Sequence, residues 1–229
     1  MQTVETVRLV AEAPGALEQA VEALEQGKVI AFPTDTVYGV GAHAFQEAAV
    51  ADLFVIKERP IRLPLPLLLP DAVVIESVCT NVPPLAWQLA ERFWPGGLSL
   101  VLHRSSAVPD SVTAGGSTVA VRVPDNSLVR ELCRRLDAPL AATSANRHGQ
   151  PAPVTADEAE AALRGRIPLL LDGGRCTGGL ASTVVDLSVW PPVLLRPGPV
   201  TARQLAEVLP LAGDTVPRPE GMRALSQEE

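Results

Sequence analysis

The stretch Lys28-Val-Ile-Ala-Phe-Pro-Thr-Asp-Thr-Val-Tyr-Gly-Val-Gly41 decides the fold, because an apolar run of strand length ends here in a polar, glycine-bearing loop. Pro33 ends the run, since proline has no N–H to donate to a strand ladder. Three short oxygen-bearing side chains follow at once: Thr34, Asp35 and Thr36. In open α/β sheets, ligands bind outside the carboxyl ends of strands, so this loop is a candidate ligand site. The same residues also suit an ordinary turn, and the stretch alone leaves both interpretations open.

The composition indicates a single α/β domain. The chain has 229 residues, of which 47% are hydrophobic, enough for one full core. No apolar run reaches the roughly 18 residues that a membrane helix needs, and residues 1–13 lack the basic-then-apolar form of a signal peptide. We therefore expect a cytoplasmic protein without a membrane partner. The net charge of −7 argues against a general nucleic-acid binder but leaves a local basic cleft open.

Cysteine and lysine usage narrows the chemistry. Cys79, Cys133 and Cys176 have no paired spacing, which favours buried thiols over a disulfide framework or a zinc site. Of the 19 basic residues, only Lys28 and Lys57 are lysines. A chain that otherwise uses arginine and keeps Lys57 suggests a need for a compact ammonium there.

Hydrophobic periodicity and turn residues predict alternating strands and helices. We expect helices over 14–26, 46–57, 83–93 and 128–136, and helices that begin at Thr155 and Thr201 with capping boxes. We expect strands over 28–32, 98–102, 118–123, 139–142, 167–171, 182–187 and 193–195, with the proline-rich segment 63–70 as an edge strand or extended loop. Several connections are too short for helical crossovers, so the sheet should be mixed. Residues 1–210 form the domain in this prediction, and residues 211–229 form a flexible tail.

Polar side chains gather at the ends of these predicted strands or face inward. Lys57 lies on the apolar face of its helix, although a cation at a helix C-terminus is also favoured by the dipole. Arg122 shares a strand face with Thr118 and Ala120. The candidates that these patterns give are Thr34, Thr36, Lys57, Arg59, Arg122, Thr143, Ser144, Asn146, Ser182 and Arg196.

This set excludes most hydrolase templates, because it has no histidine dyad, no paired carboxylates and no cysteine with a base. It also lacks the glycine-rich fingerprints of the common nucleotide folds. Cations with small hydroxyl and amide groups suit a polyphosphate, a carboxylate or both. The residues alone therefore predict an anion-handling α/β enzyme that uses a nucleotide, with no bound metal of its own.

Seven blocks, in order along the chain, resemble the threonylcarbamoyl-AMP synthase family with its YrdC-like domain. They are Phe32-Pro-Thr-Asp-Thr-Val-Tyr-Gly-Val-Gly41, Lys57-Glu-Arg-Pro60, Trp94-Pro-Gly-Gly-Leu98, Thr118-Val-Ala-Val-Arg-Val-Pro124, Ser144-Ala-Asn146, Ser182-Thr-Val-Val-Asp186 and Leu195-Arg-Pro-Gly198. The resemblance covers roughly residues 15–209. It implies a twisted, mixed, open β-sheet flanked by helices around a positively charged cleft.

The resemblance also implies a reaction. L-threonine, bicarbonate and ATP would give threonylcarbamoyl-AMP and pyrophosphate, with Mg²⁺ carried by the nucleotide. A partner transferase would then pass the threonylcarbamoyl group to an adenosine of tRNA (the t6A modification), so that a contact with tRNA is one further expectation. Carbamate attack on the α-phosphate needs no protein nucleophile, so the protein would position the substrates and neutralise charge.

Roles carry over from the resemblance residue by residue. Lys57, Arg59, Ser144, Asn146 and Arg196 would hold ATP, and the first four of these form the family's catalytic signature. Thr34, Thr36, Thr118, Arg122, Ala142, Thr143 and Ser182 would line the threonine site, with Arg122 on the carboxylate. Leu63, Leu68 and Ala152 stand where many relatives have asparagine, histidine and serine.

Those departures keep a second interpretation open. A YrdC-like paralogue without synthase activity could bind double-stranded RNA or tRNA through the same cleft. The acidic net charge and the four signature residues favour the enzyme.

Overall fold

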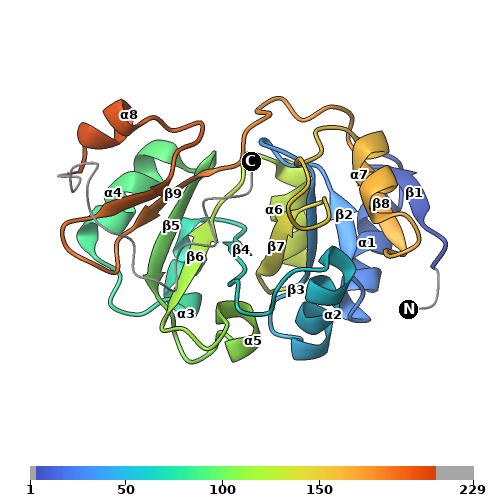
Figure 1. The fold of residues 1–229 in the computed structure, drawn as a ribbon, viewed down its shortest axis with the longest axis horizontal. Coiled ribbons are helices and arrows are strands. Elements are labelled where there is room, and N and C mark those ends of the chain that lie inside the picture. The colour runs from blue at the N-terminus through green and yellow to red at the C-terminus, as the bar shows by residue number, and fades with distance from the viewer. Residues whose placement is uncertain (1–3, 210–229) are drawn as a thin grey trace.

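The computed structural model describes residues 4–209, and within them the chain forms one ten-stranded sheet (Figure 1). The strand order is β1-β8-β2-β3-β7-β4-β6-β5-β9-β10, with parallel and antiparallel pairs. The strands are β1 (Val7–Val10), β2 (Ile30–Phe32), β3 (Gly39–His43), β4 (Leu67–Leu68), β5 (Leu98–His103), β6 (Thr118–Arg122), β7 (Leu140–Ser144), β8 (Leu169–Asp172), β9 (Thr183–Asp186) and β10 (Val193–Arg196).

Helices cover the two faces of this sheet unequally. On one face lie α1 (Ala16–Glu25) and α6 (Ser127–Arg135), packed on β2, β7 and β8. The other face carries α2 (Glu47–Lys57), α3 (Ile75–Val78), α4 (Pro84–Phe93), α5 (Asp110–Thr113), α7 (Ala156–Leu163) and α8 (Ala202–Ala206), with the short 3-10 helix η1 (Ala72–Val74) beside α3. None of the helices among the described residues combines the length and apolarity that a bilayer crossing requires.

The expected elements are present, and their ends follow local chemistry. Gly27 adopts φ 75° just beyond α1, the left-handed conformation that ends many helices. Thr155 and Thr201 form the predicted capping boxes of α7 and α8. The three cysteines are free and buried. The mixed open sheet is confirmed, whereas the predicted tail (211–229) lies outside the described residues.

Two predictions about strands were wrong. The segment 63–70 contributes β4, which lies in the middle of the sheet between β7 and β6 rather than at an edge. A strand of only two residues fits there because Pro66, just before it, only accepts a bond, from the amide of Ala142 (3.0 Å), and Pro70 lies beyond its end. No strand was expected between 32 and 46, but Gly39–His43 forms β3.

Two glycines of β3 make room for an aromatic ring. A Cβ on Gly39 would lie 2.8 Å from the ring of Phe32, and one on Gly41 would lie 3.2 Å from it. These glycines therefore allow β2 and β3 to pair around a buried phenylalanine. The elements β1, η1, α3 and α5 were not predicted, because they are short or lie at an edge.

Uneven coverage of the sheet leaves room for a site. Side chains alternate between the two faces of a sheet. Every second residue of β5, β6 and β9 therefore points to the face on which α1 and α6 lie, but these two helices pack mainly on β2, β7 and β8. The register places Leu68 beside Arg122, and Leu68 packs in the core beneath α1 and α6. Arg122 and its same-face neighbours thus lie where helical cover ends. Figure 1 shows β4 at the centre, between the halves of the molecule.

The single tyrosine of the chain anchors the loop that follows β8. Tyr38 is fully buried, and its hydroxyl donates to the carbonyl of Gly174 (2.7 Å) and accepts from the amide of Gly173 (3.2 Å). Burial is the main cause that raises the pKa of Tyr38 from its usual 10.0 to about 12. The neutral hydroxyl is therefore the form that the fold stabilises.

We expect this tyrosine to report on the fold. Because the folded pKa lies above the unfolded one, the stability linked to Tyr38 is present below pH 10 and is lost as the pH rises through about 12. Tyrosinate absorbance should titrate near 12 in the native protein and near 10 after denaturation. Tyr38→Phe should lower the free energy of unfolding by about 1–3 kcal/mol, because the two hydrogen bonds of the tyrosine hydroxyl to the backbone of Gly173 and Gly174 are lost. A native pKa that matches the denatured one would contradict this placement.

Candidate functional site

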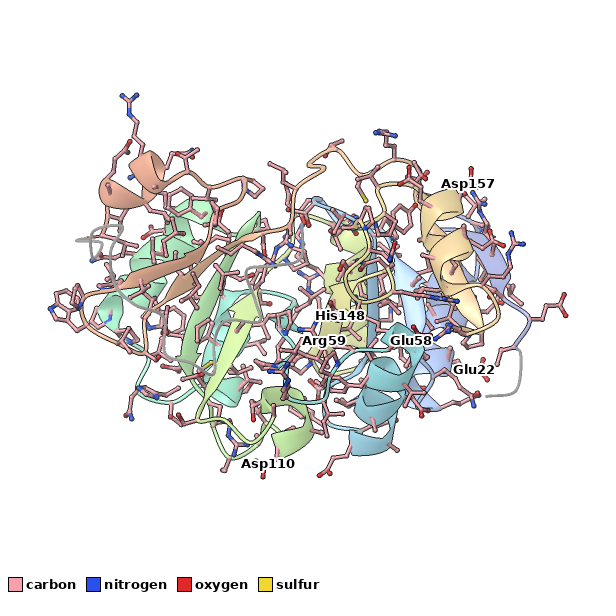
Figure 2. All side chains as sticks on the ribbon, in the orientation of Figure 1. Glu22, Glu58, Arg59, Asp110, His148 and Asp157 are labelled. Carbon is pink, nitrogen blue, oxygen red and sulfur yellow. The ribbon has the colours of Figure 1, made fainter. Side chains whose placement is uncertain are left out.

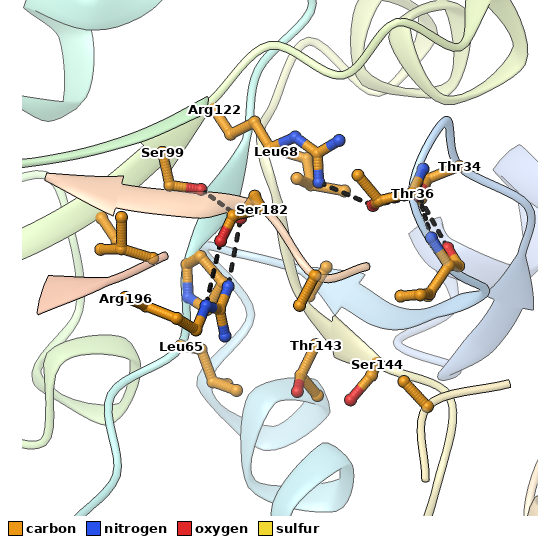
Figure 3. A pocket seen from close by; sticks show the side chains of 18 of the residues that line it. Thr34, Thr36, Leu65, Leu68, Ser99, Arg122, Thr143, Ser144, Ser182 and Arg196 are labelled. Atoms are coloured by element: carbon orange, nitrogen blue, oxygen red, sulfur yellow. Dashed lines mark hydrogen bonds between the residues drawn. The ribbon is translucent and has the colours of Figure 1, made fainter. Parts of the chain in front are cut away.

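A pocket opens on the uncovered part of the sheet face, between the Thr34–Thr36 loop, the ends of β7 and β9, and the segment before β4 (Figure 3). Part of its lining comes from alternating positions of one strand, as with Thr118, Ala120 and Arg122 of β6, and the rest comes mainly from loops. The residues that line it include Thr34, Thr36, Gly39, Arg59, Leu65, Leu68, Ser99, Thr118, Ala120, Arg122, Ala142, Thr143, Ser144, Asn146, Ala152, Ser182, Val184 and Arg196.

Arg122 is a buried cation of this pocket. Its side chain is only 7% exposed. Nε donates to the carbonyl of Gly96 (2.8 Å), Nη1 to Oγ1 of Thr36 (3.0 Å) and Nη2 to a carboxylate oxygen of Asp35 (2.6 Å). Burial lowers the pKa of Arg122, and the charge and hydrogen bond of Asp35 oppose that shift. Each terminal nitrogen keeps a second N–H, so the guanidinium can still bind an anion.

Asp35 supports this arginine without lining the pocket. Its backbone carbonyl accepts the amide of Gly178, and the carbonyl of Thr36 accepts that of Gly179. A side chain has no room at Gly178, because its Cβ atom would lie 2.6 Å from the carbonyl oxygen of Asp35. The glycine-rich loop after β8 therefore holds the Thr34–Thr36 loop against Arg122.

Ser182 and Arg196 meet on the opposite wall. Arg196 donates through Nε to the carbonyl of Ser182 (3.0 Å) and through Nη2 to its hydroxyl (3.2 Å). The hydroxyl of Ser99 lies 2.9 Å from that of Ser182, and both are buried (Figure 3). Ser99 was missed from the sequence, although its alternation within 98–102 places it on the pocket face. Its only signal was a serine within an apolar strand.

Lys57 faces inward, as predicted, but lies behind the pocket wall. It is fully buried, and Nζ donates to the carbonyl of Ser144 (2.5 Å), to Oδ1 of Asn146 (3.0 Å) and to Oγ1 of Thr143 (3.2 Å). Ser144 also donates to Oδ1 of Asn146 (2.5 Å). The ammonium therefore organises the loop after β7, whose side chains line the pocket.

Arg59 completes the cationic lining. It is 6% exposed, and it donates to the carbonyls of Leu63 (3.4 Å) and Pro64 (3.2 Å). Leu68 and Ala152 line the pocket, whereas Leu63 does not. The wall beside Arg122 is thus apolar at Leu68, where a substrate would contact hydrocarbon.

The lining favours anionic ligands. Arg59, Arg122 and Arg196 line the pocket, and none of its lining residues within 4–209 is a carboxylate, histidine or cysteine. Figure 2 shows Glu22, Asp110 and Asp157 at the periphery of the molecule, and Glu58, also labelled there, pairs with Arg166 and does not line the pocket. Among the described residues, no group of three or more His, Cys, Asp or Glu side chains is placed to hold a metal ion. The site can therefore bind and orient charged groups without a protein nucleophile of these types.

The structure brings the predicted site residues together. All twelve residues predicted from the patterns or from the resemblance line this one pocket except Lys57, which contacts three of those that do. The residues that the sequence did not single out, such as Leu65, Ser99, Ala120 and Val184, are mostly apolar or small.

Comparisons with known proteins find a matching family and close relatives of known name. Residues 22–198 match the Sua5–YciO–YrdC family, described as "Telomere recombination". The threonylcarbamoyl-AMP synthase of Pyrococcus abyssi is 42% identical over 186 residues, which are 81% of this chain and 55% of that protein. A putative threonylcarbamoyl-AMP synthase of Mycobacterium tuberculosis H37Rv is 39% identical over 190 residues, 83% of this chain and 87% of that protein.

The fold has solved relatives as well. The crystal structure of P. abyssi Sua5 complexed with L-threonine superposes with a TM-score of 0.85 at 38% identity, covering 95% of this chain and 66% of that one. The present chain spans about half the length of the curated relatives from P. abyssi and Bacillus subtilis, 55% and 56% respectively.

The ion pair between Arg122 and Asp35 should contribute to the stability of the fold. Asp35→Asn would leave Arg122 buried with its charge uncompensated, so we expect a loss of about 3 kcal/mol in the free energy of unfolding. The matched control is Asp110→Asn, because Asp110 pairs with Arg104 at 2.5 Å but its side chain is 76% exposed. That variant should lose at most about 1 kcal/mol. Equal losses in urea denaturation would show that Asp35 does not stabilise the buried arginine.

Proposed function

The chain belongs to the Sua5–YciO–YrdC family, and we propose that it is an L-threonylcarbamoyladenylate synthase, a nucleotidyltransferase. Its substrates are L-threonine, bicarbonate and ATP, and its products are threonylcarbamoyl-AMP and pyrophosphate. The observation that carries this proposal is one pocket with two kinds of subsite: a buried arginine among hydroxyls at one end, and further cations with a hydroxyl-amide loop at the other.

The threonine subsite lies around Arg122. A buried guanidinium with a spare N–H on each terminal nitrogen suits a carboxylate held by two parallel bonds. Hydroxyls and small side chains surround it, and Leu68 gives the amino acid an apolar contact. The surrounding residues are Thr34, Thr36, Thr118, Ala142, Thr143 and Ser182. The P. abyssi relative was crystallised in complex with L-threonine, which supports this choice of amino acid.

The ATP subsite lies toward Arg59, Ser144, Asn146 and Arg196. Lys57 stands behind the loop of Ser144 and Asn146 and adds positive charge there. Because no described lining residue is a carboxylate, the donor set fits a Mg²⁺ ion held by phosphate oxygens and water. Such an ion supplies charge neutralisation on the triphosphate.

The threonine subsite and the ATP subsite adjoin each other, as the proposed reaction requires. The amine lone pair of threonine forms an N–C bond to bicarbonate, and hydroxide leaves with an amine proton as water. An oxygen of the resulting carbamate attacks the α-phosphorus of ATP, and the bond to pyrophosphate breaks. Ser182 on the threonine side is bonded to Arg196 on the ATP side, so the reacting groups would be held close together.

The protein orients the substrates and neutralises their negative charges. Arg122, Arg59 and Arg196 offset the charge of a carboxylate and a triphosphate, in a site where Arg59 and Arg122 are buried. The product, an acyl-adenylate, would pass to a threonylcarbamoyl transferase that modifies tRNA, in the cytoplasm. Arg122 is too deeply buried to meet the phosphate backbone of a duplex, which favours the enzyme over an RNA-binding module.

One assay tests the proposal directly. The protein is incubated with ATP, labelled bicarbonate and single amino acids, and both pyrophosphate and labelled acyl-adenylate are measured. Pyrophosphate release should require threonine and bicarbonate together. Release that is independent of either substrate, or no labelled adenylate, would refute the proposed activity.

Arg122→Lys tests the carboxylate contact. Lysine keeps the charge but cannot form two parallel bonds, so KM for threonine should rise about tenfold or more, equivalent to about 1.4 kcal/mol. KM for ATP should stay within about twofold. The control is Arg134→Lys on α6, whose side chain is 48% exposed and should change neither constant. An unchanged threonine KM in Arg122→Lys would place the carboxylate elsewhere.

A further inference from the structure

The hydroxyls of Thr34 and Thr36 form a hydrogen-bond chain whose direction is determined. Oγ1 of Thr34 lies 2.6 Å from the carbonyl of Val37, which can only accept, so the single proton of Thr34 is used there. The two hydroxyl oxygens lie 2.9 Å apart. Because Thr34 has no further proton, Thr36 is the donor in any hydrogen bond between the two hydroxyls. Thr34 therefore receives the proton of Thr36.

The second bond of Thr36 completes the assignment. Its oxygen accepts Nη1 of Arg122 at 3.0 Å. A hydroxyl has one proton and two lone pairs, so Thr36 retains one lone pair and no proton for a ligand. Thr36 lines the pocket and is buried at 3% exposure. It therefore presents a hydrogen-bond acceptor to the pocket, directly beside the guanidinium.

Backbone contacts keep this arrangement in place. The amides of Thr36 and Val37 also donate to Oγ1 of Thr34 at 3.1 and 3.2 Å, so they share its two lone pairs with the Thr36 hydroxyl, which is nearer at 2.9 Å. The carbonyl of Thr36 accepts from Gly179 at 2.8 Å. Figure 3 shows the bond from Arg122 to Thr36 and the neighbouring position of Thr34. Thr36 cannot exchange its donor and acceptor roles without losing one of these bonds.

We infer that Thr34 is a positioning residue, which keeps Thr36 as an acceptor for the α-amino group of the amino-acid substrate. The inference rests on the proposed function. In an α-amino acid the amine lies next to the carboxylate, as Thr36 lies next to Arg122. An acceptor binds an N–H of the amine and leaves the nitrogen lone pair free to attack bicarbonate. A donor hydroxyl at this place would instead occupy the lone pair that must form the N–C bond.

The test uses ligands that lack one group each. Dissociation constants are measured by calorimetry for L-threonine, for (R)-3-hydroxybutanoate, which lacks the amine, and for L-2-aminobutanoate, which lacks the hydroxyl. The proteins are the wild type, Thr34→Val, which keeps the shape but removes the hydroxyl, and the matched control Thr34→Ser, which keeps the hydroxyl. Thermal unfolding of each variant shows that it is folded.

The measured quantity is the ratio of dissociation constants for hydroxybutanoate and threonine. In the wild type and Thr34→Ser this ratio should be at least about tenfold larger than in Thr34→Val, the effect of about 1.4 kcal/mol. A merely structural role would weaken both ligands by the same factor and leave the ratio unchanged. The ratio of the dissociation constants for L-2-aminobutanoate and threonine should be the same in Thr34→Val as in the wild type.

Other outcomes overturn the inference in distinguishable ways. Two results would show that Thr36 does not accept from the amine: an unchanged ratio of the dissociation constants for hydroxybutanoate and threonine in Thr34→Val, or a fall in the ratio for aminobutanoate and threonine. Either result would leave the proposed function intact as long as the wild type makes the adenylate. Absence of threonine binding and of adenylate in the wild type would refute the proposed function itself. If Thr34→Val does not fold, Thr36→Val serves in its place, with Thr36→Ser as its control and the same ratios expected.

Discussion

A buried guanidinium links the loop after β2 to β6 and to the segment before β5. Arg122 projects from β6, yet its bonds reach Gly96 before β5 and the Thr34–Thr36 loop after β2. In the sheet order, β3, β7 and β4 lie between β2 and β6, so these bonds connect segments that do not pair as strands. Burial of the charge would be costly without Asp35, so the loop and the strand depend on each other.

The position of the pocket follows from how the sheet is covered. Helices α1 and α6 protect one part of a face, and beyond them the same face turns polar at Ser99, Arg122 and Ser182. Buried polar groups need partners, and here they find them in one another, as in the pair of Ser99 and Ser182. A pocket whose walls are already hydrogen-bonded is organised before a ligand arrives, which lowers the entropy that binding must overcome.

Support for the lining comes from a second layer of residues. Lys57 holds the loop after β7, Asp35 holds Arg122, and Tyr38 holds the loop after β8. Lys57 and Asp35 act directly on residues that line the pocket, whereas Tyr38 acts through the loop that packs against Asp35 and Thr36. Their shared property is a polar group at or just beyond the end of a strand or helix, placed behind the surface that a ligand would meet.

The amino-acid sequence by itself determined the mixed α/β class, most of the long helices and strands, and nearly all of the polar lining. Period-two alternation placed Thr118, Ala120 and Arg122 on one face, and that pattern is local, so it can be recognised without tertiary contacts. Only the tertiary structure decided the central place of β4 and the location of Lys57 behind the wall. It also decided the partnership of Ser99 with Ser182 and the direction of the bonds from Arg122 through Thr36 to Thr34. The physical reason is that strand order and hydrogen-bond partners join residues far apart in the chain, and no local pattern records which of them meet.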